Sequence, residues 1–127
     1  TMKRGAIVVI LNSNLEVLLL KRPDYVHWAP SQWAFPGGKI EKGESSRDAA
    51  VRETREETTL EARDLVYISE LSHGTVDYFF SNTFTGEVQI DFEHDDWTWV
   101  SREETKYYDT APQVVELYDW ALKYVRR

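Results

Sequence analysis

Three glutamates, Glu53, Glu56 and Glu57, lie within five residues of one another in this 127-residue chain. In a helix, at about 100° per residue, these side chains fall on one face, within about 100° of one another. Like charges at such spacings destabilise a helix by roughly 0.2–0.5 kcal/mol per pair. Arg52 lies one turn before Glu56 and can offset part of this repulsion, and a divalent cation could offset more. Alternatively, the three glutamates alone could form a solvated acidic helix face.

The kind of cation follows from the ligand atoms, because every candidate side-chain ligand in this stretch offers oxygen. Carboxylates together with substrate phosphates suit Mg²⁺, and Mn²⁺ can substitute for it, whereas zinc prefers His or Cys. Such an ion can bridge phosphate oxygens, neutralise developing charge and lower the pKa of bound water. The pair Gly37-Gly38 precedes the acidic stretch, so a backbone carbonyl could reach the same ion without side-chain obstruction.

The acidic stretch requires a helix to position it. Ser45 is a suitable N-cap with Asp48 three residues later, and the segment to about Thr58 contains neither Gly nor Pro. Val51, Thr54 and Thr58 fall opposite the glutamates and can pack against a sheet. The sequence therefore predicts a helix with one acidic face and one buried face.

Short apolar or alternating runs elsewhere in the chain predict strands. Ala6–Leu11 and Leu15–Leu20 are expected to form a hairpin through Asn12-Ser13-Asn14. A final helix is expected to begin near residues 110–113, with apolar positions at three- and four-residue steps. This order predicts one α+β domain over residues 2–127, with an α/β/α layering. The remaining expected strands are Gln32–Phe35, Leu65–Leu71, Thr75–Phe84, Val88–Phe92 and Trp97–Val100.

Composition narrows the class of protein. The net charge of −7 disfavours a general nucleic-acid surface, because phosphate backbones require a basic footprint. No apolar run reaches the roughly 18 residues that suggest a membrane span, and no signal peptide is expected at the start. The absence of Cys excludes disulfides and thiolate chemistry and fits a reducing, cytoplasmic location.

The region from Gly38 to Leu60 resembles the Nudix box, in which a glycine, five residues, a glutamate and seven residues precede Arg-Glu-x-x-Glu-Glu. The matching positions are Gly38, Glu44, Arg52, Glu53, Glu56 and Glu57. The resemblance extends to Arg22 after the second expected strand, to the run Trp33-Ala34-Phe35-Pro36-Gly37-Gly38, and to Glu93 before Trp99. It therefore covers most of the chain and implies the Nudix fold, an α/β/α sandwich around a mixed β-sheet.

The resemblance also implies roles. Glu53, Glu56 and Glu57 are expected to ligate Mg²⁺, with the Gly38 carbonyl as a further ligand. Arg52 is expected to orient one of these glutamates, and Glu44 to support the loop–helix geometry. The general base stays open between a box glutamate, with Glu53 first, and Glu93.

Substrate contacts are expected outside the helix. Arg22 and Lys39 are candidate phosphate contacts. A nucleotide base could stack on one or two of the aromatic residues, which in a small domain mostly belong to the core. The aromatic candidates are Tyr25, Trp28, Phe35, Tyr78 and Phe80.

Two box positions depart from the family pattern. Thr54 stands where an aliphatic residue is usual, and Thr59 stands where a glycine usually ends the helix with positive φ. We expect a modest cost in stability or geometry, with the chemistry intact.

The resemblance implies a hydrolase that cleaves a phosphoanhydride bond of a nucleoside diphosphate derivative. The short chain and the strand Trp97–Val100 are most similar to mutator-T-type enzymes, which favours a (deoxy)nucleoside triphosphate cleaved to monophosphate and pyrophosphate. Dinucleoside polyphosphates, nucleotide sugars, capped RNA and a non-catalytic nucleotide sensor stay open as alternatives, as does a homodimer. The expected partner is a small-molecule nucleotide, with neither a membrane nor a long nucleic acid.

Overall fold

The structure is a computed structural model that describes residues 2–72 and 74–127. Strands and helices alternate irregularly along the chain rather than as a βαβ repeat. In order, they are β1 (Gly5–Ile10), β2 (Val17–Lys21), β3 (Trp33–Ala34), β4 (Gly37–Lys39), α1 (Ser46–Thr58), β5 (Glu61–Arg63), β6 (Val66–Tyr67), β7 (Val76–Ser81), β8 (Thr83–Thr85), β9 (Asp96–Val100), the 3₁₀ helix η1 (Glu103–Tyr107) and α2 (Val114–Arg126).

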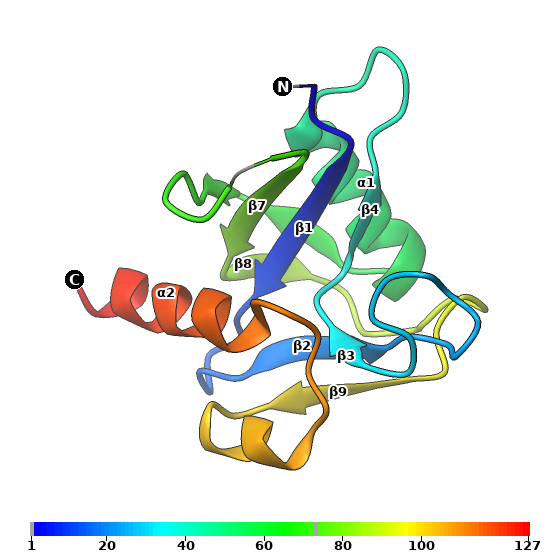
Figure 1. Ribbon diagram of the computed structural model, residues 1–127. Helices are drawn as coiled ribbons and strands as arrows, with labels where there is room; N and C mark the ends of the chain where they lie inside the picture. The colour runs from blue at the N-terminus through cyan, green and yellow to red at the C-terminus, as the bar shows by residue number, and fades with distance from the viewer. Residues whose placement is uncertain (1, 73) are drawn as a thin grey trace.

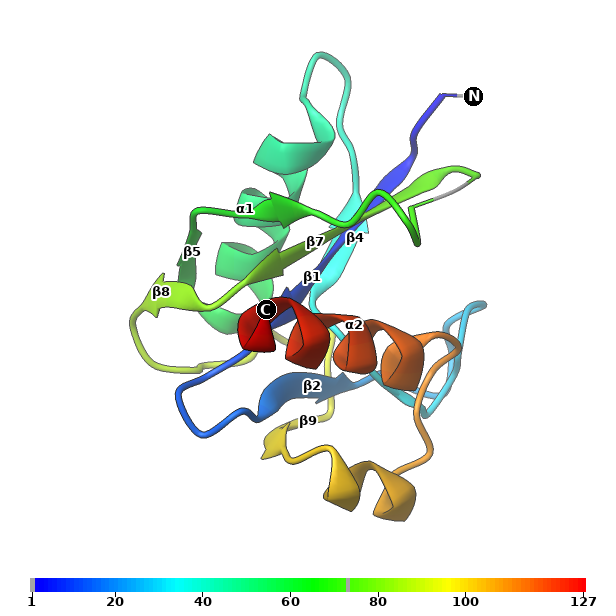
Figure 2. The ribbon, with the colours of Figure 1, turned by 90° about the vertical axis from the view of Figure 1, so that its left-hand side faces the viewer.

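The central layer is a mixed sheet in the order β4-β1-β7-β6. Strand β1 pairs in parallel with β7 and antiparallel with the edge strand β4. A second antiparallel sheet has the order β3-β2-β9, and β5 pairs with β8. Figures 1 and 2 show α1 and α2 on opposite sides of the central sheet, so the expected α+β sandwich around a mixed sheet is confirmed.

Alternation along β1 divides the core between the two helices, because successive side chains of a strand point to opposite faces. Ala6, Val8 and Ile10 face α1, where they pack with Ala49 and other buried residues. The odd-numbered positions face α2. Each face of the sheet is therefore covered by one helix.

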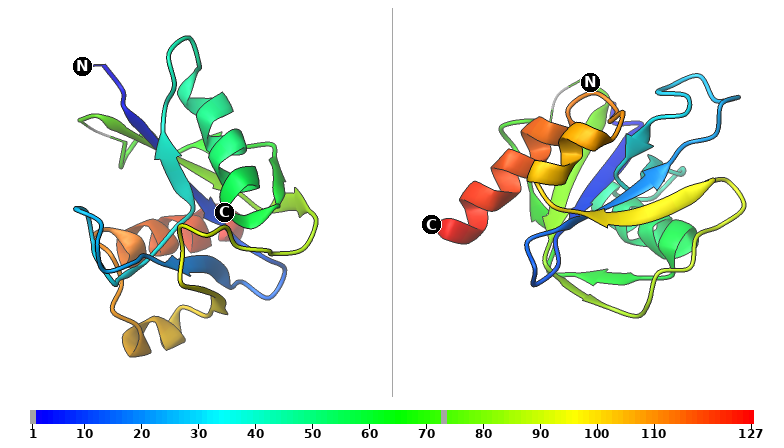
Figure 3. Two further views of the ribbon diagram at one scale, coloured as in Figure 1. Left: turned by 90° about the vertical axis from the view of Figure 1, so that its right-hand side faces the viewer. Right: turned by 90° about the horizontal axis from the view of Figure 1, so that it is seen from below.

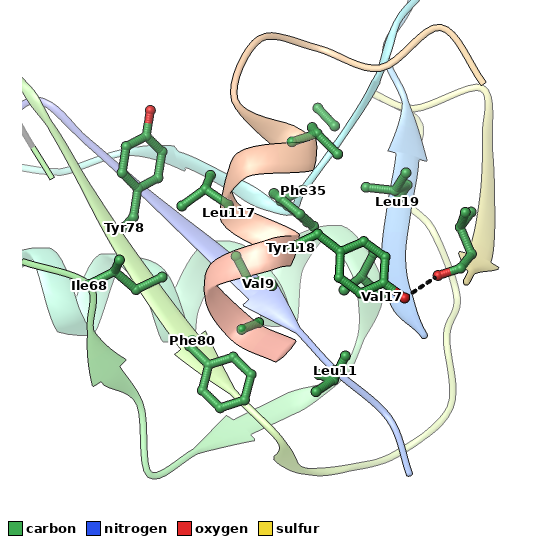
Figure 4. Packing of buried hydrophobic residues seen from close by; sticks show 14 of the residues in the cluster. Val9, Leu11, Val17, Leu19, Phe35, Ile68, Tyr78, Phe80, Leu117 and Tyr118 are labelled. Carbon is green, nitrogen blue, oxygen red and sulfur yellow. Dashed lines mark hydrogen bonds between the residues drawn. The ribbon is translucent and has the colours of Figure 1, made fainter. Parts of the chain in front are cut away.

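The α2 side of the core also contains residues of the second sheet, including Val17 and Leu19 (Figure 4). Tyr118 lies at its centre, fully buried, with its hydroxyl donating to the backbone carbonyls of Leu15 and Val100. Helix α2 is thus shared between the central sheet and the second sheet.

Several expectations about strands were wrong. Residues 6–11 and 15–20 do not form a hairpin, because β1 and β2 belong to different sheets and only Leu11 and Val17 form a bridge. The region Val88–Phe92 forms no strand. The expected strand Gln32–Phe35 is present as the shorter β3, and Gly37-Gly38 belong to a separate strand, β4, that the sequence did not predict. Local alternation predicted extended backbone, but strand pairing depends on distant segments.

The site end of the molecule is formed by two loops and the end of α1. In Figure 3, the segment between β8 and β9 passes beside the C-terminal end of α1, where the Asp91 N–H donates to the Glu57 carbonyl at 3.2 Å. The loop after β2 lies near it, and the Asp95 N–H donates to the Lys21 carbonyl at 3.0 Å. Among residues 2–72 and 74–127, no helix is long and apolar enough to cross a membrane.

Candidate active site

Helix α1 begins at a serine cap and ends at a residue with positive φ. The Ser45 side chain accepts a hydrogen bond from the Asp48 N–H at 3.0 Å, as expected for the N-cap. Thr59 ends the helix with φ 64°, in the left-handed conformation that favours glycine. Thr54 is fully buried, and its hydroxyl has no hydrogen-bond partner among the described residues.

Arg52 forms hydrogen bonds with three glutamates at the acidic face and in the loop before it. Its Nε and Nη2 donate to both carboxylate oxygens of Glu44, at 2.8 and 3.0 Å, and Nη2 also donates to the Lys39 carbonyl at 2.9 Å. Nη1 donates to Glu53 at 3.0 Å and to Glu56 at 2.9 Å. This network holds the loop before α1 against the helix and lowers the pKa of Glu44 through its bonds with Arg52. Arg52 can therefore orient two glutamates rather than one.

Glu57 is the buried acid of this face, with a residue exposure of 7%, and Glu53 is half-buried, with a side-chain exposure of 16%. Burial raises the pKa of Glu53, against the opposing effect of Arg52. Burial raises the pKa of Glu57 well above its ordinary value, although its carboxylate accepts from the Gly37 N–H at 2.9 Å. Glu56 differs, because its side chain is 55% exposed.

The glycine pair of β4 brings the backbone against these acids. A Cβ at Gly38 would lie 2.4 Å from the Glu53 carboxylate, so only a glycine leaves room for that side chain in its observed position. Gly37 donates its N–H to Glu57. The two backbone units and the carboxylates of Glu53 and Glu57 therefore form one compact group.

A cleft of about 380 Å³ lies beside the same glycines, on the α2 side of the central sheet. Gly37 and Gly38 contribute to its wall, and Arg4, Arg22 and Lys39 surround it with positive charge. Three cationic side chains of an otherwise acidic chain thus lie where an anionic ligand could enter.

Arg22 is held within this cleft by the loop after β2. Its Nε donates to the Trp28 carbonyl at 2.7 Å, and its guanidinium lies 5.0 Å from the centre of the Trp28 ring. Burial lowers the pKa of Arg22, and the charge of Glu57 partly opposes this effect. Arg22 therefore lies between the cleft and the acids.

Three of the aromatic candidates line the cleft. Tyr78 and Phe35 are each 7% exposed and both contribute to its wall, as does Trp28. The Tyr78 hydroxyl points away from the core in Figure 4 and donates to the Gln113 side chain. Burial raises the pKa of Tyr78, which favours its protonated, donating form.

The other two aromatic candidates are not cleft residues. Phe80 is 1% exposed and belongs to the core, where it packs with Trp120 and Tyr124, so the expectation that it could stack on a base was wrong. Tyr25 is 77% exposed and does not contribute to the cleft wall. Alternation along β7 explains Phe80, because it points to the same face as Tyr78 but lies deeper under α2.

Glu93 comes to the acidic group from the distal loop. Its charge helps to raise the pKa of both Glu53 and Glu57, and Asp91 acts in the same way on Glu57. Its carboxylate is bound to none of the described side chains. The structure thus brings Glu93 close to the helix although 36 residues separate it from Glu57 in the sequence.

The donor set fits a hard divalent cation. The carboxylates of Glu53 and Glu57 and the Gly38 carbonyl supply only oxygen ligands, and burial, which raises the pKa of both acids, makes their ionised forms costly without a nearby positive charge. In the part of the chain that the structure describes, no three acidic or histidine side chains converge as a ready-made cage. Arg52 and the Gly37 N–H engage the carboxylates instead, so a cation would have to compete with these bonds.

Three contributors to this region were not among the residues singled out from the sequence: Arg4, Asp91 and Gln113. Gln113 immediately precedes α2, and its φ of 73° turns the chain into the helix beside Tyr78. Arg4 lies before β1, and Asp91 lies in a polar loop. Only the tertiary structure distinguishes these from ordinary surface residues.

Comparisons with known proteins agree with this geometry. The NUDIX domain family model matches residues 1–121. Mouse bis(5'-nucleosyl)-tetraphosphatase (asymmetrical) is 32% identical over 114 residues, which cover 80% of this chain and 75% of the mouse protein. The CTP pyrophosphohydrolase of Escherichia coli is 34% identical over 117 residues, covering 87% and 85% of the two chains. A MutT structure, from a study of the Aliivibrio salmonicida and Vibrio cholerae proteins, superposes with a TM-score of 0.77 and 26% identity over 93% of this chain and 97% of that one.

Proposed function

Because this chain belongs to the Nudix family and is a hydrolase of nucleotide derivatives, we propose that it is a Mg²⁺-dependent pyrophosphohydrolase. Its substrate is a nucleoside or deoxynucleoside triphosphate, which it cleaves to the monophosphate and pyrophosphate. Residues 2–127 act as one domain, and Mn²⁺ can substitute for Mg²⁺.

One observation carries this proposal: the cationic cleft and the carboxylates of Glu53 and Glu57 meet at Gly37 and Gly38. The cleft lies on one side of the edge strand β4, and Glu53 and Glu57 lie on the other. A nucleoside in the cleft can therefore extend its phosphates around the strand edge at Gly37 and Gly38, which have no side chains. The volume of about 380 Å³ falls in the range of small-molecule sites.

The cleft residues supply binding and orientation. Arg22 and Lys39 contact the phosphates, and Arg4 adds positive charge at the same mouth. Phe35 packs against the nucleoside. The Tyr78 hydroxyl and the Gln113 amide offer hydrogen-bonding groups to the edge of the base.

The acidic face supplies the cation site. The ligands for Mg²⁺ are the carboxylates of Glu53, Glu56 and Glu57 and the carbonyl of Gly38. The bonds of Arg52 with Glu44 and Glu53 hold the loop before α1 in place against the helix. When bound, the ion neutralises charge on the phosphates and lowers the pKa of a water molecule. Arg22 stays beside the leaving phosphates and offsets part of their charge.

Glu93 accepts the proton of the attacking water. It is exposed, close to Glu53 and Glu57 and bound to none of the described side chains, whereas Glu53 is committed to the cation and to Arg52. Glu53 is the alternative base.

The test is a panel of nucleoside triphosphates, dinucleoside polyphosphates and nucleotide sugars, incubated with the purified chain and Mg²⁺ or with EDTA. We expect Mg²⁺-dependent release of monophosphate and pyrophosphate from at least one triphosphate. Hydrolysis in ¹⁸O-labelled water, followed by mass spectrometry, identifies the phosphorus that is attacked. The absence of Mg²⁺-dependent hydrolysis across the panel would contradict the proposal.

Variants of the acidic face test the assigned roles. Glu57→Gln and Glu56→Gln should each lower kcat by about 100-fold or more, because each removes a charged ligand while keeping the shape of the side chain. The control is Glu103→Gln, since the Glu103 side chain is 86% exposed and lies on η1. Near-normal turnover in both helix variants would exclude the assigned metal site.

A dinucleoside polyphosphate is the second candidate, since the mouse relative is named for hydrolysis of bis(5'-nucleosyl) tetraphosphates. Both candidates use the same cleft for one nucleoside. They differ at the far end of the phosphate chain, where a triphosphate ends and a dinucleoside polyphosphate carries a second nucleoside. Comparison of kcat/KM for the two classes in the same panel separates them.

A further inference from the structure

The distal loop that carries Glu93 has a histidine with a buried side chain in a segment that is mostly acidic and mostly exposed. Residues 91–96 read Asp-Phe-Glu-His-Asp-Asp. The His94 side chain is only 8% exposed and that of Asp91 15%, whereas Phe92 is 93% exposed. A polar ring that is buried between two exposed neighbours must be held by specific contacts.

The contact that holds it is internal to the loop. His94 Nδ1 lies 2.8 Å from Asp91 Oδ1, and the His94 N–H also approaches the Asp91 carbonyl at 3.5 Å. An ionised carboxylate can only accept, so Nδ1 carries the hydrogen and donates it. This bond closes a tight turn with Phe92 and Glu93 at its outside.

The turn is fixed at both ends by backbone bonds to the site. At one end the Asp91 N–H donates to the Glu57 carbonyl at 3.2 Å, and at the other the Asp95 N–H donates to the Lys21 carbonyl at 3.0 Å. These bonds fix where the loop begins and ends. They do not fix the direction of Glu93, which lies between them.

Repulsion from the neighbouring acidic side chains opposes the observed position of Glu93. Its charge is close enough to Glu53 and Glu57 to act on both, and Asp91 adds to the charge around Glu57. Four of the six residues from 91 to 96 are acidic, so the segment is self-repelling. His94 is the one residue of this segment whose side chain can donate to a carboxylate within it.

We propose that His94 is a positioning residue for hydrolysis, and that its Nδ1–H bond to Asp91 holds the turn so that Glu93 faces the acidic end of α1. This inference rests on the proposed function, in which Glu93 accepts the proton of water. His94 itself contacts neither water nor substrate. Its effect on turnover passes through Glu93 alone.

Two amide substitutions separate the positioning bond from simple loss of a ring. Asn places its N–H₂ near the position of His Nδ1, whereas Gln places it near Nε2, away from Asp91. We expect His94→Asn to keep most of the turnover, and His94→Gln and His94→Ala to lower kcat by about 10-fold or more. KM should change little, because no cleft residue is altered.

A double-mutant cycle tests the route of the effect. In a Glu93→Gln background, which should itself lower kcat, His94→Gln should produce no further loss, since the group it positions is already gone. The matched control is Asp95→Ala, because Asp95 is exposed in the same loop and bonds through its backbone. Thermal unfolding of every variant is measured in parallel.

The outcomes distinguish this inference from the function on which it rests. If the wild type hydrolyses no nucleotide, the proposed function fails. If it does hydrolyse one but Glu93→Gln keeps normal turnover, Glu93 is not the base and the positioning role is overturned with it. If Glu93→Gln is impaired and His94→Gln equals His94→Asn, or if the losses add in the double variant, only the positioning role is overturned.

Discussion

At the scale of single residues, the site is built from charges that the fold keeps partly unsatisfied. Glu57 is buried beside the half-buried Glu53, and Arg52 directly bonds only Glu53. Burial of a carboxylate without a full counter-charge favours its neutral form. The protein without a cation therefore carries an electrostatic cost at this face, and that cost depends on pH.

The free energy of unfolding of the protein without a cation should depend on pH because of Glu57. Because the folded-state pKa of Glu57 is raised, the folded protein binds more protons than the unfolded chain above the ordinary glutamate range. In EDTA, the free energy of unfolding should therefore fall as pH rises from that range through the raised pKa. Glu57→Gln should flatten this part of the profile. Urea unfolding at several pH values measures both.

Added Mg²⁺ gives the matching check. A cation that binds the ionised carboxylates stabilises the folded state by mass action, so it should raise the melting temperature of the wild type most at the higher pH values. Glu57→Gln should respond less. Superimposable pH profiles for the two proteins in EDTA would rule out Glu57 as the source of the dependence.

At the scale of elements, the edge strand β4 separates the cleft from the acidic helix. It pairs with β1 on one side only, and its two glycines present backbone to both neighbours. The glycines differ in what a side chain would meet. At Gly38 the obstacle is the flexible tip of Glu53, and at Gly37 it is the backbone of Ala6 and Ile7.

This difference predicts opposite phenotypes for two alanine substitutions. Gly38→Ala should displace the Glu53 carboxylate and lower kcat by about 10-fold or more, with little change in stability. Gly37→Ala would place a Cβ 2.4 Å from the Ala6 carbonyl oxygen, which must separate β4 from β1 and should cost about 1–3 kcal/mol or more. Steady-state kinetics and urea unfolding of both variants test this difference between the two glycines. Equal losses of stability in the two variants would contradict it.

The end of α1 carries a second element-scale prediction. Thr59 adopts φ 64°, and its hydroxyl donates to the Glu87 carbonyl at 2.5 Å at an exposed position. Removing the strain of a left-handed non-glycine residue should outweigh an exposed hydrogen bond, so Thr59→Gly should raise the free energy of unfolding by about 0.5–1 kcal/mol.

Thr59→Ala is the matched control for this position, because it keeps the Cβ and its strain but loses the hydroxyl. It should be no more stable than the wild type. If Thr59→Ala and Thr59→Gly were equally stable, backbone strain at this cap would not be the cause of the difference.

At the scale of the whole molecule, α2 joins the two main sheets. Its buried face packs under the central sheet, and Tyr118 reaches across to the ends of β2 and β9 through the carbonyls of Leu15 and Val100. Burial raises the pKa of Tyr118 to about 12, so its hydroxyl stays protonated and able to donate at physiological pH. Helix α2 begins beside the cleft, immediately after Gln113.

The change Tyr118→Phe tests the hydrogen bonds by which α2 is joined to the second sheet. The substitution keeps the packing but leaves two carbonyls without their donor, so it should lower the free energy of unfolding by about 1–3 kcal/mol. Activity well below the melting temperature should change little. Tyr107→Phe is the control, since Tyr107 is 75% exposed. An unchanged unfolding midpoint for Tyr118→Phe would contradict the role of this hydroxyl.

The sequence by itself determined the features that depend on local spacing. The acidic face of α1, its N-cap at Ser45 and the network of Arg52 follow from positions three, four or eight residues apart. The box pattern identified the family, because its residues lie in one short segment.

Tertiary structure alone decided what depends on contacts between distant segments. Backbone hydrogen bonds can form between any two extended segments, so the sequence could not predict that β1 pairs with β7 and β4 rather than with β2. For the same reason it could not assign Gln113 to Tyr78, Phe80 to the core, or His94 to a turn that faces α1. Local chemistry fixed which groups are available, and long-range packing fixed which of them meet.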